Sequence, residues 1–120
     1  MKTPSAVQVW NHACELAIQT HHTLAPCSNA VIREEITRTS IDVAAEIAQG
    51  YELKSRHDGH ALLSSARGTC AALRTRLYIA GQLNMIEHRQ SDRLINETLQ
   101  ISAELEELLE QYDHKYCPWN

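Results

Sequence analysis

The 120-residue sequence contains no phenylalanine, and its aromatic residues are limited to two tryptophans and four tyrosines. Its core is therefore expected to consist of leucine, isoleucine, valine and alanine side chains. No window approaches the roughly 18 apolar residues that a membrane-spanning helix needs, so no such helix is expected. The sequence also lacks a stretch with the apolar–polar alternation of a half-buried strand, and it lacks a repeat of about 40 residues. These absences favour an all-α protein with one aliphatic core.

The cysteines are too far apart for the C-x-x-C spacing of zinc and redox sites: Cys14, Cys27, Cys70 and Cys117. The first residues lack the apolar run of a secretory signal peptide. We therefore expect a cytoplasmic protein whose thiols stay reduced. Cys14 and Cys70 lie on or beside apolar stripes, where a thiol acts as a small apolar side chain.

Sequence motifs of common catalytic sites are missing. There is no P-loop, no glycine-rich dinucleotide turn and no G-x-S-x-G. Carboxylate-bridged di-iron bundles need Glu-x-x-His on two helices, and this sequence has no such motif. His57 and His60 lie one helical turn apart and could share a metal. His12 and Glu15 form the reverse motif, His-x-x-Glu. Exposed or capping histidines are the simpler interpretation of these residues. The sequence thus predicts no enzyme, no cofactor and no metal site.

Charge is unevenly distributed along the chain, whose net charge is −4 with neutral histidines. This balance disfavours a general nucleic-acid binder, which usually carries a basic excess. The segment 54–76 nevertheless holds one acidic residue and five basic ones: Lys54, Arg56, Arg67, Arg74 and Arg76. The segment 97–113 is acidic, with no basic residue. Either the two segments attract one another within or between subunits, with Arg74 binding a neighbouring glutamate in a bidentate manner, or the basic residues form a rim that holds phosphates.

Apolar residues recur at helical spacing in four segments, of which the best defined runs from Ile32 to Gly50. Its stripe advances by three or four residues at each step, which keeps the side chains on one helical face: Ile32, Ile36, Thr39, Val43, Ile47 and Gly50. Helices are predicted at residues 5–23, 29–50, 56–83 and 88–112, followed by a non-helical tail at 113–120. Because the connections are short, we expect an antiparallel up-down-up-down four-helix bundle, formed as a single domain over residues 1–120.

Capping residues mark the helix ends. Ser5 and Gln8 have the spacing of a capping box at the start of the first helix. Ser28 or Asn29 is expected to cap the second helix. Asn84 is expected to take the left-handed conformation that follows the third helix.

Four further residues carry specific expectations. Trp10 lies on the first apolar stripe and is expected to be the large anchor of the core. Gly50 is expected to end the second helix in the left-handed conformation. Gly68 lies in mid-helix, where glycine costs about 1 kcal/mol relative to alanine, so we expect another backbone to approach it closely. Arg38 is expected to be partly buried and paired with an acid one turn away, such as Glu35, and so to hold its helix against a neighbour.

Three segments resemble a known family. The first helix reads V-W-x-x-A-x-x-L-A from Val9, the second reads R-T-S-I-D-V-A-A-E-I-A-Q-G from Arg38, and the third reads A-R-G-T-C-A-A-L-R-T-R-L from Ala66. The corresponding patterns of the bacterial four helix bundle protein family are V-W-x-x-A-x-x-L-A, R-A-A-x-S-I-P-x-N-I-A-E-G and A-x-G-S-x-x-E-L-E-T-x-L. Founding members of this family are encoded in intervening sequences of 23S ribosomal RNA genes. The resemblance covers roughly residues 6–112.

The resemblance implies a homo-oligomer, expected to be a homopentameric ring, without enzymatic activity. The matching positions expected to serve structure or oligomerisation are Trp10, Arg38, Ile47, Gly50, Gly68, Leu73 and Leu77. Several polar positions depart from the family pattern. Glu46 replaces an asparagine, Gln49 replaces a glutamate, and Ala72 and Arg74 stand where the third helix usually carries acids.

Together these features favour a non-enzymatic, self-assembling bundle that acts as an assembly or adaptor protein. The alternative is a nucleic-acid accessory protein, the role of a distant relative of the family, the basic accessory protein of diversity-generating retroelements. The residues that would bind RNA or DNA through a rim on the third helix are Lys54, Arg56, Arg67, Arg74 and Arg76. A third hypothesis is a bundle enzyme with a metal at His57 and His60.

Overall fold

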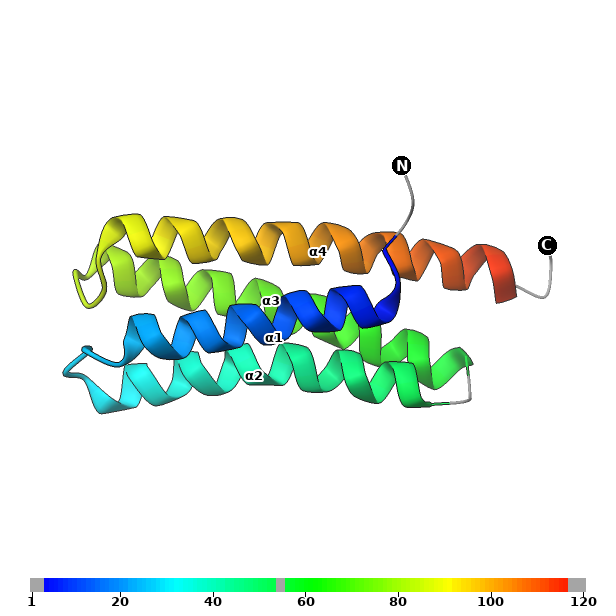
Figure 1. Cartoon of the computed structure of the whole chain (residues 1–120), viewed down its shortest axis with the longest axis horizontal. Helices are drawn as coiled ribbons and strands as arrows, with labels where there is room; N and C mark the ends of the chain where they lie inside the picture. The colour runs from blue at the N-terminus through cyan, green and yellow to red at the C-terminus, as the bar shows by residue number, and fades with distance from the viewer. Residues whose placement is uncertain (1–3, 54–55, 117–120) are drawn as a thin grey trace.

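The computed structural model describes residues 4–53 and 56–116, with side chains for all of these except residues 56 and 112–116. Its helices are α1 (Ala6–Leu24), α2 (Ala30–Glu52), α3 (Arg56–Gln82) and α4 (His88–Tyr116). Consecutive helices run in opposite directions along the long axis (Figure 1). α2 packs against α1 and α3, and α4 packs against α3 and α1. The predicted four-helix bundle is confirmed, and the α1–α2 face lies opposite the α3–α4 face.

The core is aliphatic, as the absence of phenylalanine predicts. Each helix contributes a buried stripe at helical spacing, and the largest fully buried side chains are leucines, isoleucines and valines. The predicted stripe of α2 is buried from Ile36 to Gly50. Leu73 and Leu77 of α3 have no exposed surface, and the same is true of Ile47 in α2.

Three of the predicted helix ends are confirmed. At the start of α1, the Gln8 backbone N–H donates to Ser5 Oγ (3.2 Å), and the Ser5 N–H donates to Gln8 Oε1 (2.9 Å). Asn29 caps α2, with its Oδ1 accepting the Ile32 N–H at 3.1 Å. Asn84 has a φ of 59°, so the predicted left-handed residue after α3 is confirmed.

Gly50 does not end α2, contrary to its predicted role. The helix continues to Glu52, and none of the described glycines has a positive φ. The structure gives a different reason for glycine here. A Cβ on Gly50 would lie 3.2 Å from the backbone oxygen of Gly59 and 3.3 Å from Leu63 Cγ. Gly50 therefore allows the start of α3 to pack closely against the end of α2.

Trp10 is not the core anchor that its position on the stripe predicts, because 39% of its surface is exposed. The neighbouring Val9 is fully buried instead, and the buried stripe of α1 continues from it through Ala13 and Leu16. One residue corresponds to about 100° around a helix, so a small shift of the buried face moves Trp10 outward. Gly68 was also expected to contact another backbone, yet it is exposed and a Cβ there would meet no atom within 4 Å.

α4 extends four residues beyond its predicted end and reaches Tyr116, so the expected non-helical tail is wrong for residues 113–116. The first proline in this region is Pro118, and residues 113–116 themselves contain no glycine or proline that would end the helix earlier. The rest of the predicted tail, residues 117–120, lies outside the described residues. Within the described segments, no helix combines the length and the apolarity needed to span a bilayer.

Candidate binding groove and apolar patch

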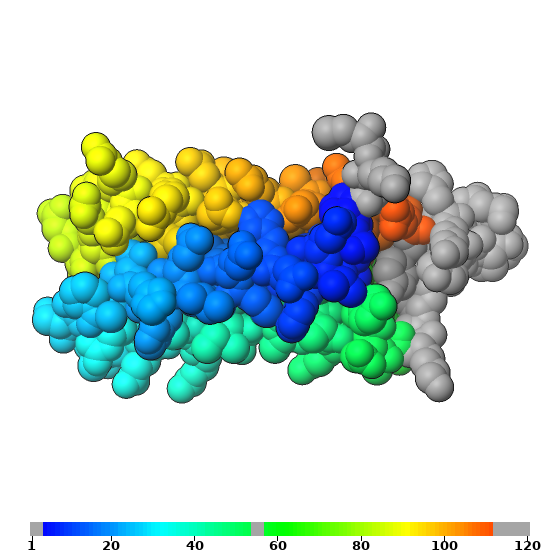
Figure 2. All heavy atoms as spheres, viewed as in Figure 1, coloured from blue at the N-terminus to red at the C-terminus, as the bar shows by residue number. Residues whose placement is uncertain are grey.

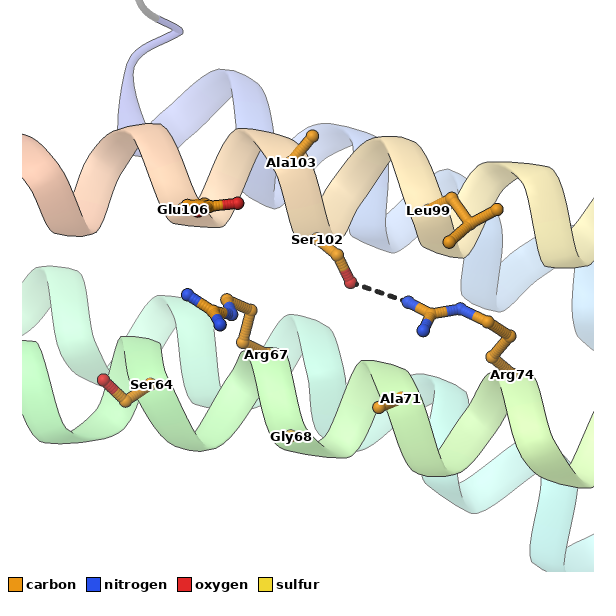
Figure 3. Close-up of a pocket in the computed structure, with 9 residues that line it drawn as sticks. All are labelled: Ser64, Arg67, Gly68, Ala71, Arg74, Leu99, Ser102, Ala103 and Glu106. Atoms are coloured by element: carbon orange, nitrogen blue, oxygen red, sulfur yellow. Dashed lines mark hydrogen bonds between the residues drawn. The ribbon is translucent and has the colours of Figure 1, made fainter.

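An open groove of about 640 Å³ runs between α3 and α4 on the outside of the bundle. Its α3 wall carries Arg67 and Arg74, two of the predicted nucleic-acid-binding residues. Figure 3 shows both side chains extending over the groove toward α4. The lining residues are Ser64, Arg67, Gly68, Ala71, Arg74, Leu99, Ser102, Ala103 and Glu106. We call this cavity the α3–α4 groove.

Arg74 is held in place by neutral groups. Its Nε donates to Thr98 Oγ1 at 3.0 Å, and its Nη2 donates to Ser102 Oγ at 2.9 Å. The Thr98 hydroxyl in turn donates to the Ile95 carbonyl at 2.6 Å. The two hydroxyls orient the guanidinium without neutralising it, because no carboxylate among the described residues forms an ion pair with Arg74.

Arg67 lies seven residues before Arg74 and is exposed. In Figure 3, Glu106 lies on the opposite wall, across the groove from Arg67. The described residues nevertheless offer Arg67 no ion pair. Between the two arginines, α3 contributes Gly68 and Ala71 to the lining, so the floor of the groove consists of small residues.

The other predicted members of the basic rim do not join this groove. Arg76 faces α2, where its Nε donates to Glu35 Oε1 at 3.1 Å. Lys54 and the side chain of Arg56 lie outside the described residues. The structure therefore brings together Arg67 and Arg74, and it separates Arg76 from them.

Arg38 is exposed rather than partly buried, and it borders a separate hollow of about 370 Å³ between α1 and α2. Of its expected acidic partners, Glu35 pairs with Arg76 instead. Across the part of the chain that the structure describes, Arg38 has no ion pair. The expectation of a partly buried, internally paired arginine is therefore wrong, since the residue lies on the outer side of α2.

His12 forms a clasp between α1 and α4 that the sequence analysis missed. Its Nε2 lies 2.5 Å from Glu97 Oε2, and its Nδ1 lies 2.7 Å from Glu104 Oε1. Burial lowers the pKa of His12, but the hydrogen bonds to both carboxylates and their charges outweigh this effect and raise the pKa above the usual 6.5. Only the imidazolium can donate from both nitrogens, so this geometry fits the charged form. The seven-residue spacing of Glu97 and Glu104, which places both on one helical face, was the available signal.

A second polar cluster joins α2 to α3. Glu46 accepts a hydrogen bond from the Thr69 hydroxyl at 2.6 Å and another from the Ser65 hydroxyl. Glu46 stands where the family pattern of the second helix has asparagine, and in this chain its hydrogen bonds connect α2 to α3. Among the described residues, no group of three or more His, Cys, Asp or Glu side chains is placed to hold a metal ion.

An apolar patch lies on the opposite face of the bundle, where the start of α1 meets the end of α2. Val7, Trp10 and Tyr51 expose 46%, 39% and 58% of their surfaces. They surround a hollow of about 230 Å³, which Ala48 also lines. Figure 2 shows α1 between α2 and α4 on this side of the molecule. We call Val7, Trp10, Ala48 and Tyr51 the α1–α2 patch.

The fold places the chain among antiparallel helical-bundle proteins. Its family follows from sequence comparison: residues 5–107 match the model of the family described as 23S rRNA-intervening sequence protein, and the chain belongs to that family. The match includes all of α1, α2 and α3. The family resemblance inferred from the three helical patterns is thus confirmed. No curated protein matches the chain.

Proposed function

We propose that this protein is a non-enzymatic, cytoplasmic bundle that associates with copies of itself and acts as an assembly or adaptor protein. The observation that carries this proposal is the α1–α2 patch. Trp10 and Tyr51 are large side chains that a monomer leaves partly in water, although both lie beside a hollow that a partner side chain could fill. Aromatic residues of this kind are enriched at the centres of protein interfaces.

Trp10 and Tyr51 are 39% and 58% exposed, so together they leave about 200 Å² of mainly apolar surface in water, given that an aromatic side chain buries about 150–250 Å². At about 25 cal/mol per Å², covering this surface contributes up to about 5 kcal/mol. A stable interface buries about 800 Å² on each partner. The patch can therefore supply the centre of an interface but not its whole area. Ile18 and Ile41, which are exposed on the same two helices, supply further apolar surface.

A Trp10→Glu variant tests the patch. Because Trp10 is already partly exposed, the substitution should spare the fold and weaken association by placing a charge in an apolar contact. Leu83→Glu is the matched control, since Leu83 is 59% exposed but lies in the turn after α3, at the other end of the bundle. Light scattering should show a lower mass for Trp10→Glu and an unchanged mass for Leu83→Glu. Equal masses for both variants and the wild type would remove the patch from the interface.

A nucleic-acid accessory function is the second candidate, and it is supported by the positive charge of the α3–α4 groove. Arg67 and Arg74 are the two arginines that would contact phosphates. This function predicts RNA or DNA binding that weakens strongly as the salt concentration rises. The double substitution Arg67→Glu with Arg74→Glu should abolish such binding. Binding that survives the double substitution would exclude the groove as the nucleic-acid site.

A further inference from the structure

The two arginines of the α3–α4 groove present positive charges at a defined spacing. A helix rises about 1.5 Å per residue, so positions seven apart are separated by about 10 Å and lie on nearly the same face. Figure 3 shows the side chains of Arg67 and Arg74 extending in the same direction along α3. Their guanidinium groups therefore keep approximately the spacing of the backbone positions.

Both charges are available to a binding partner. Arg74 is oriented by Thr98 and Ser102, whose hydroxyls leave its positive charge in place. Arg67 is exposed and unpaired within the described part of the chain. By contrast, Arg76 on the same helix already has a carboxylate, Glu35, within 3.1 Å. A preoriented guanidinium loses little further freedom when it binds a carboxylate in a bidentate manner.

The floor of the groove is open at Gly68. A Cβ at this position would meet no atom within 4 Å, so packing within the chain does not require glycine. Glycine inside a helix is nevertheless less stable than alanine by about 1 kcal/mol. Ala71 on α3 and Ala103 on α4 also line the groove. Because these side chains are small, the backbone of another element can approach the groove closely. Leu99, which is 48% exposed, adds an apolar contact on the α4 wall.

We propose that the α3–α4 groove binds an α-helix of another protein that carries two carboxylates seven residues apart. The rise of such a helix is the same as that of α3, so its carboxylates can meet Arg67 and Arg74 together. A small residue between them would face Gly68. This surface lies opposite the α1–α2 patch, so the inference does not depend on self-association.

Charge favours an acidic helix over a nucleic-acid strand. A continuous polyanion would pass Glu106 on the opposite wall, on a chain whose net charge is −4. A helix can instead place a neutral residue beside Glu106.

The binding test uses two labelled helical peptides of identical composition, measured by fluorescence anisotropy against the full chain. One peptide carries glutamates seven residues apart, and the other carries them five residues apart, where they point to different sides of the helix. The first should bind about tenfold more tightly, which corresponds to one charge-assisted contact. Equal affinities for the two peptides would overturn the proposal.

Variants of the protein assign the binding to the groove. The double substitution Arg67→Glu with Arg74→Glu should abolish binding, and a peptide with lysines at the same spacing should then bind instead. Arg89→Glu with Arg93→Glu is the control of equal charge, since both residues are exposed on α4 and neither lines the groove. This control should leave the affinity unchanged within about twofold.

Two further variants separate a docked helix from general attraction between charges. Gly68→Leu should block binding while the thermal stability is retained, because the position is open to solvent. Glu106→Gln should strengthen binding by removing a like charge. Undiminished binding by Gly68→Leu would show that no helix lies on the groove floor.

Two outcomes would replace the proposed occupant. A structured RNA that displaces the peptide and is lost with the same double substitution would assign the groove to nucleic acid. Dissociation of the wild-type oligomer by that double substitution would assign it to a second copy of this chain. Peptide binding by Trp10→Glu should match that of the wild type, so a failure of the α1–α2 patch and a failure of the groove can be told apart.

Discussion

Replacing Gly68 with alanine should stabilise the protein, whereas the same replacement at Gly50 should not. Both residues lie inside helices, where alanine gains about 1 kcal/mol over glycine. At Gly68 the new Cβ would meet no atom within 4 Å, so the gain should be realised in full. For a domain of this size, it corresponds to an increase of about 3–5 °C in Tm.

At Gly50 the new Cβ would lie 3.2 Å from the backbone oxygen of Gly59 and 3.3 Å from Leu63 Cγ. A backbone oxygen cannot move aside as the end of a flexible side chain can, so α2 and α3 must separate slightly. Overpacking of this kind costs about 1–3 kcal/mol. Because both variants share the gain in helix propensity, the difference between their free energies of unfolding isolates this cost.

Urea denaturation followed by circular dichroism, at one protein concentration, measures both variants against the wild type. Gly68→Ala should be the more stable variant by about 1–3 kcal/mol. Equal stabilities would refute the close packing of α2 on α3 at Gly50. A destabilised Gly68→Ala would mean that its Cβ meets a group that is not part of this bundle.

Three further predictions concern the clasp, the core and the surface. The folded pKa of His12 is raised above its unfolded value, so the stability that the clasp contributes should be complete below about pH 6.5 and decline as the pH rises through the folded pKa. Urea denaturation of wild type and His12→Gln from pH 5.5 to 8.5 should therefore show a difference in the free energy of unfolding that shrinks with rising pH. A difference that grows would contradict the clasp. Leu77→Ala should lower the free energy of unfolding by about 2–5 kcal/mol in urea denaturation, because Leu77 is fully buried, and a loss below 1 kcal/mol would be too small for a core leucine. Arg76→Ala should lower the free energy of unfolding in urea denaturation by less than about 1 kcal/mol, since the side chains of Arg76 and Glu35 are 38% and 49% exposed and water screens their ion pair, and a larger loss would indicate a contact beyond this pair.

Helical periodicity was sufficient to predict the bundle because four stripes must bury one another. It could not fix which of two adjacent residues faces the core. Val9 and Trp10 are both apolar, and only the packing of α1 against α2 and α4 selects the smaller one. Residue preferences predicted the backbone conformation correctly at Asn84, where the conformation depends on neighbouring residues. They failed at Gly50, where glycine is needed for a contact with α3.

Some contacts of the polar residues could likewise be predicted from the sequence, and others could not. The sequence analysis assigned Arg67 and Arg74 to one basic rim on the third helix, and the structure places both on one groove. No spacing could show that Arg76 turns toward Glu35 on α2, because that contact joins residues 41 positions apart. The two contacts of the His12 clasp join residues 85 and 92 positions apart. The sequence could therefore show only that Glu97 and Glu104 share a helical face.

The mass of the wild-type protein in solution tests self-association most directly. Light scattering should be recorded at about 50 and 200 mM salt, with and without a structured RNA, because affinity carried by several phosphate contacts falls by orders of magnitude over this range. We expect a mass well above the 13.6 kDa of one chain, five times that value for a ring of five, and unchanged by salt or RNA. A mass of one chain under all these conditions would contradict self-association, and a mass that rises with RNA only at low salt would favour the nucleic-acid function instead.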